Sequence, residues 1–303
     1  MALLLLSTPE RGAVWSRVFS AADEPLYLSE DEVRDPAEIT QIACWVPPRD
    51  IGRYPNLKVL ISTGAGVDQM PPLPEGIALS RTIAPGIEEM VRDWVVMATL
   101  MAHRDMPVYL DQARRGLWAA HPVETTARRR VGIMGMGRIG RLAARSLVSL
   151  GFPVSGWSRS GAAVEGVEIF SEDALPAFLE RTGLLVCLLP LTPYTRGILN
   201  ADLLARLPDG AALVHAGRGG HLDMSAIGAA LDSGRLSSVI LDVTSPEPLP
   251  GDHPFWRDPR VIITPHIAAN TDNGQGARHA LAVIAACRNG HAVPGLVDPE
   301  RGY

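Results

Sequence analysis

A strand, a glycine-rich loop and a helix in direct succession constrain the fold of this chain more than any other feature. The apolar run Val131–Met134 leads into Gly135-x-Gly137-x-x-Gly140, and a helical pattern follows. In a dinucleotide-binding loop the first glycine permits a tight turn, the second lets the main chain approach a pyrophosphate, and the third allows close helix packing. The helix N-terminus offers amides and a positive dipole end to the anion. A glycine-rich turn without a ligand is the alternative, and we favour a dinucleotide site.

The rest of the chain alternates β-rich runs with helical patterns, which is typical of parallel sheets covered by helices. The candidate strands are 2–6, 41–46, 58–61, 77–79, 131–134, 153–157, 184–188, 211–215, 238–241 and 261–263. Because 303 residues exceed the usual size of one domain, we predict an α/β protein with two doubly wound parallel-sheet domains. Two long helical runs bracket the later strands. We expect a cofactor domain at 98–271, inserted in a substrate domain made of 1–97 and 272–303.

Composition and charge exclude several classes of function. A net charge of −5 argues against nucleic-acid binding, which needs a clustered basic surface. The apolar start of the chain lacks the basic residues and cleavage site of a signal peptide, and no stretch approaches the roughly 20 apolar residues that span a bilayer. Cys44, Cys187 and Cys287 are far apart, so they suggest neither a disulfide framework nor a metal site. We therefore expect a soluble, cytoplasmic protein with no metal and no nucleic-acid or membrane partner.

The end of the strand after the glycine loop indicates which dinucleotide binds. An NAD-selective fold places an acidic residue there, about 20 residues after the first glycine, against the ribose hydroxyls. This chain has Trp157, Ser158, Arg159 and Ser160 instead. The Ser158 hydroxyl can donate a hydrogen bond to a 2′-phosphate, and Arg159 adds a positive charge with a planar set of donors. We predict NADP, with NADPH preferred over NADH; a solvated Arg159 and relaxed selectivity are the alternatives.

An ordered set of further motifs runs through the chain. They are Leu188-Leu189-Pro190-Leu191-Thr192-Pro193, Ala216-Gly217-Arg218-Gly219, Leu241-Asp242-Val243, Glu247-Pro248-Leu249-Pro250 and Ile263-Thr264-Pro265-His266. With these motifs the chain resembles the D-isomer-specific 2-hydroxyacid dehydrogenases over nearly its full length. Three more segments are similar to the glyoxylate/hydroxypyruvate reductase A branch of that family: Trp45-Val46-Pro47-Pro48, Gly64-Ala65-Gly66-Val67-Asp68 and the ending 297–303.

The resemblance implies a fold, an assembly and a set of residue roles. The fold is a Rossmann cofactor domain inserted in a flavodoxin-like substrate domain, and a homodimer is expected because the family's members are usually dimers. Arg218, Glu247 and His266 would form the catalytic set. The implied substrate-binding residues are Trp45, Gly64, Ala65, Gly66, Arg218 and His266. The implied cofactor-binding residues are Gly135, Met136, Gly137, Arg138, Ile139, Gly140, Trp157, Ser158, Arg159, Ser160, Leu189, Pro190, Thr195, Ala216, Gly217 and Asp242, the last contacting the nicotinamide carboxamide.

The three catalytic candidates also suit the reaction on physical grounds. Reduction of a 2-keto acid needs a proton donor at the carbonyl oxygen and a cation that holds the carboxylate and polarises the carbonyl. Arg218 follows a strand, and its planar guanidinium suits the second task. His266 also follows a strand and suits the first, and a carboxylate such as Glu247 would favour its protonated form. The remaining histidines are interpreted as surface or structural, with His121 the next candidate: His103, His121, His215, His221, His253, His279 and His291.

The sequence therefore predicts an NAD(P)-dependent 2-hydroxyacid dehydrogenase that uses NADPH to reduce glyoxylate or hydroxypyruvate to the D-2-hydroxy acid. His266 would donate the proton. One alternative is an enzyme that works in the oxidative direction on another D-2-hydroxy acid. Another is a nucleotide-sensing corepressor on the same fold, which would bind the cofactor without turnover; the intact Arg218, Glu247 and His266 count against it.

Overall fold

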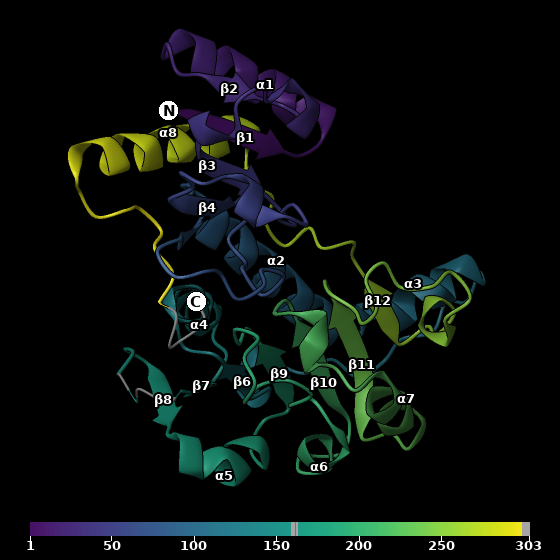
Figure 1. Ribbon diagram of the computed structural model, residues 1–303. Coiled ribbons are helices and arrows are strands. Elements are labelled where there is room, and N and C mark those ends of the chain that lie inside the picture. Colours follow the sequence, from purple (N-terminus) through teal and green to yellow (C-terminus); the bar gives the residue numbers. More distant parts are fainter. Residues whose placement is uncertain (159–160, 162, 299–303) are drawn as a thin grey trace. The chain divides into compact units, whose positions relative to one another are not determined.

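The computed structural model describes residues 1–158, 161 and 163–298 of the chain. Arg159, Ser160 and the ending 299–303 lie outside the described residues. The chain divides into two compact units, a terminal unit of Met1–Ile87 with Asn270–Tyr303 and a central unit of Glu88–Ala269 (Figure 1). Among the described residues, no helix combines the length and the apolar character needed to cross a membrane.

The terminal unit is built on a five-stranded parallel sheet in the order β2-β1-β3-β4-β5, which is the strand order of flavodoxin-like folds. Its strands are β1 Ala2–Leu6, β2 Leu26–Tyr27, β3 Ile39–Cys44, β4 Val59–Ser62 and β5 Ala78–Arg81. Helix α1 (Pro9–Ala21) packs against α8 (Asn273–Asn289). Trp15 and Phe19 of α1 share one apolar core with residues of α8, so the first and last helices of the chain stabilise the same unit.

The central unit contains a seven-stranded parallel sheet in the order β12-β11-β10-β9-β6-β7-β8, the doubly wound dinucleotide-binding order extended by one strand. The strands are β6 Val131–Met134, β7 Val154–Trp157, β8 Val167–Phe170, β9 Leu184–Cys187, β10 Ala211–His215, β11 Leu236–Leu241 and β12 Val261–Ile263. The helices are α2 Ile87–His103, α3 Met106–Arg114, α4 Arg138–Ser149, α5 Leu175–Leu179, α6 Ala201–Leu204 and α7 Met224–Asp232. The predicted α/β class with two parallel sheets is confirmed.

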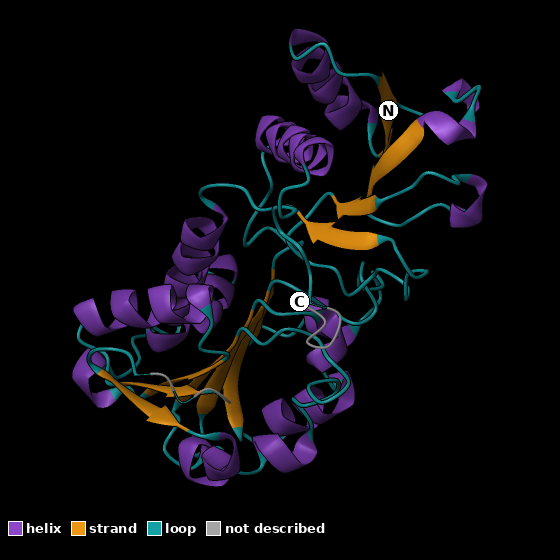
Figure 2. Ribbon diagram, turned by 60° about the vertical axis from the view of Figure 1, so that its left-hand side comes forward, coloured by secondary structure: helices purple, strands orange, loops and turns teal. Residues whose placement is uncertain are grey.

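The inner strands β6, β9 and β10 of the central sheet are buried on both faces, which explains why they are nearly continuous apolar runs in the sequence. Along β10, Leu213 joins a core that includes α6 and α7 residues, whereas the next residue, Val214, joins a core that includes α2 and α4 residues. Successive side chains of a strand point to opposite faces, so both must be apolar here. Figure 2 shows the strands of this sheet between helices.

The structure differs from the sequence expectation at two edge strands and at both unit boundaries, the second of which falls at 269/270 and not at 271/272. β2 and β8 were not predicted: β2 has two residues, and β8 is a partly exposed edge strand that carries the charged Glu168. The first unit boundary falls at 87/88, ahead of the expected 97/98, because almost all of α2 packs with the central unit. Which unit holds cofactor and which holds substrate stays a prediction.

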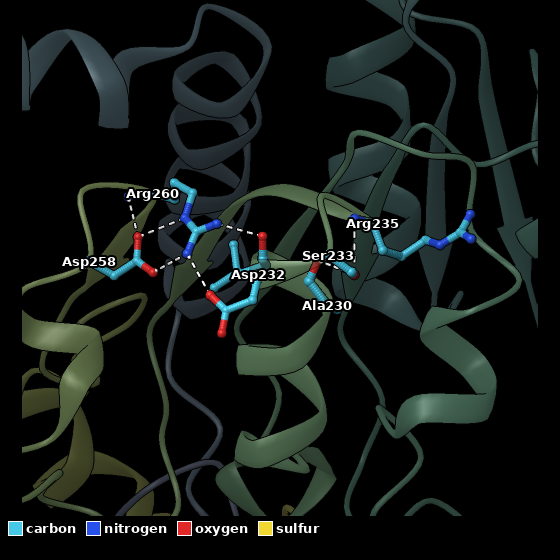
Figure 3. Close-up of polar contacts among 7 residues, drawn as sticks. Ala230, Asp232, Ser233, Arg235, Asp258 and Arg260 are labelled. Carbon is cyan, nitrogen blue, oxygen red and sulfur yellow. Dashed lines mark hydrogen bonds and ion pairs between the residues drawn. The ribbon is translucent and has the colours of Figure 1, made fainter.

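A polar cluster fixes the amino edge of the central sheet (Figure 3). Arg260, just before β12, donates to both carboxylate oxygens of Asp258 and contacts Asp232 at the end of α7. Arg260 holds the pKa of the Asp258 carboxyl below its usual range, and Asp258 raises the pKa of Arg260. The cluster joins the start of one strand to the end of a helix, so its role is structural and it lies at the opposite edge from the candidate site.

Candidate active site

The glycine loop of the central unit has the shape that a pyrophosphate requires. Gly135 has φ +103°, and a Cβ there would lie 2.8 Å from the Leu188 carbonyl oxygen. A Cβ on Gly140 would lie 2.0 Å from the Gly135 carbonyl oxygen, so the close approach of α4 to the loop excludes any side chain. A Cβ on Gly137, the N-cap of α4, would meet nothing within 4 Å. The loop therefore leaves open space where the helix N-terminus presents its amides, and it fits a dinucleotide phosphate.

The side chains of Arg138, Arg141 and Trp157, around the glycine loop, contact other residues of the central unit. Arg138 forms an ion pair with Glu88 of α2 at 2.7 Å, and Arg141 donates to the Met136 carbonyl at 3.0 Å. Trp157 is buried at the end of β7, with its indole nitrogen 3.4 Å from the Glu172 carbonyl. Ser158 is the first residue beyond the carboxyl end of β7, as the sequence predicted. Ile139, within α4, is partly buried against the core.

The three catalytic candidates leave neighbouring strands at one edge of the central sheet. In the ladder, His215 of β10 pairs with Leu241 of β11, and Leu241 pairs with Ile263 of β12. Arg218, Glu247 and His266 follow these strand ends at the carboxyl edge, where ligands bind in open α/β sheets. A Cβ on Gly219 would lie 1.7 Å from the Thr244 carbonyl oxygen, so the Arg218 loop packs directly on the segment that leads to Glu247.

His266 and Glu247 form a hydrogen-bonded pair. The His266 Nδ1 lies 2.6 Å from the Glu247 Oε1, and both side chains are partly exposed. A carboxylate accepts, so Nδ1 carries a proton and Nε2 is the nitrogen that can exchange a proton with a ligand. His266 has φ +55°, a left-handed conformation that is uncommon outside glycine. Its amide donates to the Asp242 carbonyl at 2.9 Å, which helps to hold this backbone.

Asp242 is a buried carboxylate that anchors the loop carrying His266. It accepts hydrogen bonds from the Thr264 hydroxyl at 2.6 Å and from the amides of Ile267 and Ala268 at 2.8 Å each. The indole of Trp94 in α2 donates to Thr264 at 3.1 Å and extends the network. The sequence assigned Asp242 to the nicotinamide carboxamide. In the structure its carboxylate oxygens contact the protein's own donors on both sides of His266.

His215 and His221, which were interpreted from the sequence as surface or structural residues without a site role, lie next to Arg218. Both are completely buried, and their ring centroids are 5.3 Å apart. With Cys187 they form a group whose potential metal-ligand atoms lie within 4.8 Å of one another. Burial raises the pKa of the Cys187 thiol to about 12 and lowers the pKa of His215 to about 4. All four imidazole nitrogens lie within 3.2 Å of main-chain atoms, so we assign the pair a structural role toward the main chain.

The other predicted cofactor residues lie near this cluster. Leu189 is buried, and Pro190 accepts through its carbonyl from the Thr195 hydroxyl at 2.7 Å. The Ala216 amide donates to the Cys187 carbonyl at 3.3 Å, and Gly217 follows. These residues follow the ends of β9, which is adjacent to β6 in the sheet, and of β10, the next strand beyond β9, so they share the carboxyl edge with the glycine loop.

The remaining substrate candidates belong to the terminal unit. Trp45 follows β3 and is 44% exposed, and its ring packs on the Gly64 main chain, where a Cβ would lie 2.8 Å from Trp45 Cζ3. The Ser62 hydroxyl donates to the Gly66 carbonyl at 2.7 Å and fixes the turn after β4, and Ala65 between them is exposed. The structure thus brings Trp45 and 64–66 together at the carboxyl edge of their own sheet.

The fold and the glycine loop are those of a dinucleotide-binding protein, and comparison with known proteins agrees. The family model described as D-isomer specific 2-hydroxyacid dehydrogenase, NAD binding domain, matches residues 96–268. The chain belongs to the D-isomer specific 2-hydroxyacid dehydrogenase family, and it is an NAD(P)-dependent enzyme of that family. The resemblance predicted from the motifs is thereby confirmed.

Individual relatives narrow the comparison. The chain is 37% identical to a glyoxylate/hydroxypyruvate reductase A of Salmonella paratyphi B over 96% of each chain. Among solved structures, it is similar to an NADPH-dependent glyoxylate/hydroxypyruvate reductase of Sinorhizobium meliloti in complex with NADP and sulfate, with 36% identity, a TM-score of 0.91 and full coverage of both chains. A D-isomer specific 2-hydroxyacid dehydrogenase of Xanthobacter autotrophicus Py2, in complex with NADPH and MES, is 36% identical with a TM-score of 0.90, covering 100% of this chain and 99% of that one.

Proposed function

We propose that the protein reduces glyoxylate or hydroxypyruvate to the D-2-hydroxy acid with NADPH. The observation that carries the proposal is the His266–Glu247 pair, 2.6 Å apart, at the sheet edge that also bears Arg218. A proton donor and a guanidinium at one edge supply what reduction of a 2-keto acid needs. The names of the relatives from Salmonella paratyphi B and Sinorhizobium meliloti support the choice of substrate.

Each residue has a distinct task in the proposed reaction. NADPH, when bound, supplies the hydride. The Arg218 guanidinium binds the substrate carboxylate and polarises the keto oxygen, and His266 passes the proton on Nε2 to that oxygen. Glu247 keeps the imidazole oriented through Nδ1. The Ala65 and Gly66 amides and Trp45 stay the substrate-binding candidates of the terminal unit, and the amides at the start of α4 would bind the pyrophosphate.

Measuring NADPH oxidation with glyoxylate, hydroxypyruvate and pyruvate tests the proposal. We expect turnover with the first two keto acids and a lower kcat/KM with pyruvate. Faster oxidation of a D-2-hydroxy acid with NADP than reduction of any of the three would favour the oxidative alternative. Cofactor binding without turnover of any acid would favour the corepressor alternative and would contradict the proposed enzyme.

NADPH is expected to bind at least about tenfold more tightly than NADH, a difference of roughly 1.4 kcal/mol that one charge-assisted contact can supply. Ser158 and Arg159 follow β7 where an NAD-selective fold has an acid. Titration of the intrinsic fluorescence with each cofactor measures both dissociation constants. Arg159→Ala should bring them closer, whereas Arg181→Ala should leave the ratio unchanged. Equal constants in the wild type would refute the preference.

We also propose that the protein works as a homodimer in the cytoplasm. Trp118 is fully exposed and its neighbour Leu117 is 47% exposed, an apolar surface that a second copy could cover. All three cysteines are free, which suits a reducing compartment. Light scattering should give twice the chain mass of 32.5 kDa, and Trp118→Ser should shift the protein toward one chain mass at low concentration. A wild-type monomer would contradict this assembly.

A further inference from the structure

Arg218 lies in a loop that is poor in side chains of its own. It stands between Gly217 and Gly219, and its backbone is extended, with φ −141° and ψ 146°. Its guanidinium Nη1 donates to the Gly217 carbonyl at 2.8 Å, so the direction of the side chain depends on the main chain of its own loop. The main chain of Arg218 is held by residues on both sides of it in the chain: the His221 amide donates to the Arg218 carbonyl at 3.0 Å, and the imidazoles of His215 and His221 also contact it.

His221 contacts the Arg218 amide. The amide donates to the His221 Nδ1 at 3.1 Å, so this nitrogen is unprotonated and the proton is on Nε2. His221 Nε2 lies 3.2 Å from the Pro190 carbonyl, which accepts from it. The imidazole thus bridges the Arg218 loop and the segment after β9, and its tautomer is fixed by the two partners.

His215 contacts the main-chain carbonyl of Arg218, in the peptide group that follows the residue. Its Nε2 lies 2.9 Å from the Arg218 carbonyl, and its Nδ1 lies 3.2 Å from the Cys187 carbonyl. Burial lowers the pKa of His215 to about 4, so the ring is neutral at pH 7 and has a single N–H. The shorter contact places that proton on Nε2, where it donates to Arg218.

The two rings also leave no space beside the loop. A Cβ on Gly217 would lie 2.9 Å from His215 Cε1 and 3.0 Å from His221 Nδ1. On the other side of the loop, the Thr244 carbonyl oxygen packs so closely on Gly219 that a Cβ there would lie 1.7 Å from it. The Arg218 main chain is therefore bonded at its amide and its carbonyl and packed from two sides.

We propose that His215 and His221 are positioning residues that hold Arg218, through its main chain, in the orientation needed to bind the keto acid. The inference rests on the proposed role of Arg218 as the residue that binds the substrate carboxylate. Neither imidazole touches the substrate in this proposal. Both act by fixing the main chain on the two sides of the Arg218 Cα, so their loss should weaken substrate binding while cofactor binding changes little.

Paired amide substitutions separate this role from general packing. At position 221, Asn keeps an acceptor near the place of Nδ1, whereas Gln keeps only a donor near Nε2. At position 215 the roles are reversed, because Gln keeps the donor to the Arg218 carbonyl and Asn loses it. We expect His221→Gln and His215→Asn to raise KM for glyoxylate about tenfold, since a buried group left without its partner costs more than an ordinary hydrogen bond contributes. His221→Asn and His215→Gln should stay within about threefold of the wild type.

Hydrogen exchange gives a second readout that does not depend on activity. In a peptide spanning 216–221, the Arg218 amide should exchange at least about tenfold faster in His221→Gln than in the wild type, and His221→Asn should restore its protection. The reverse order at position 221, in which Asn is the worse variant, would assign importance to the Pro190 contact and overturn the proposal. Equal KM and exchange in all four variants would also overturn it. A wild type that reduces no keto acid would refute the proposed function, and the exchange data would still decide whether His221 holds Arg218.

Discussion

His266→Ala is expected to lower kcat by about 100-fold or more, because general acid catalysis contributes typically 10²- to 10⁴-fold. In the structure, Glu247 occupies Nδ1 of His266 and leaves Nε2 to meet the carbonyl oxygen. Alanine removes this donor without altering the glycine loop on which cofactor binding depends. The dissociation constant for NADPH should therefore stay within about twofold, and single-turnover measurements would place the loss in the chemical step.

A matched control keeps this result specific to position 266. His291, an exposed histidine beyond α8, should tolerate alanine with unchanged kcat. Wild-type kcat in His266→Ala would remove this histidine from the mechanism, and His121 would become the next residue to test. His121 contacts Tyr109 and Gln112 of α3, so its present partners belong to that helix and not to the segments that carry Arg218, Glu247 and His266.

Arg218→Lys is expected to lower kcat/KM for the keto acid about 100-fold, with KM rising and kcat falling together. Lysine keeps the charge but presents a single ammonium, so it loses the two-pronged contact with the carboxylate and the keto oxygen. Loss of one donor that stabilises a developing oxyanion costs about 10²- to 10³-fold. Steady-state kinetics with glyoxylate measure both parameters.

The exposed Arg206, just after α6, provides the control for a change of arginine to lysine and should show wild-type kinetics. The dissociation constant for NADPH distinguishes a specific catalytic defect from partial misfolding, because neither His266→Ala nor Arg218→Lys should change it by more than about twofold. If Arg218→Lys altered kcat alone and left KM unchanged, the guanidinium would not bind the carboxylate in the ground state, and the proposed task of Arg218 would be wrong.

The features that could be predicted from the sequence are those that depend on local pattern. The turn at Gly135 and the close approach at Gly140 follow from short-range geometry, and the structure has both. The inner strands of the central sheet were recognisable because they are buried on both faces. β8 was missed since an edge strand of four residues, one of them Glu168, needs no such pattern.

The contacts around the candidate site were less predictable because they involve main-chain atoms of distant segments. His215 and His221 contact the carbonyls of Cys187 and Pro190, about 30 residues earlier, and residue types alone carry no signal of such partners. Asp242 was assigned to a ligand, yet its carboxylate accepts three hydrogen bonds from the loop around His266. The assignment rested on the family resemblance, which carries no information about these contacts within the protein, and it stays a prediction.

Because His266 has a left-handed backbone, a substitution there that stabilises the protein is expected to lower its activity. A non-glycine residue at φ +55° carries a strain of about 1 kcal/mol or more, and glycine or asparagine would relieve part of it. A library randomised at this position and screened only for survival of heating would therefore enrich Gly and Asn, and the enriched proteins would lack the proton donor. Histidine would be retained only if the library were also selected for turnover. The residue found at position 266 after selection therefore shows whether stability or activity was selected.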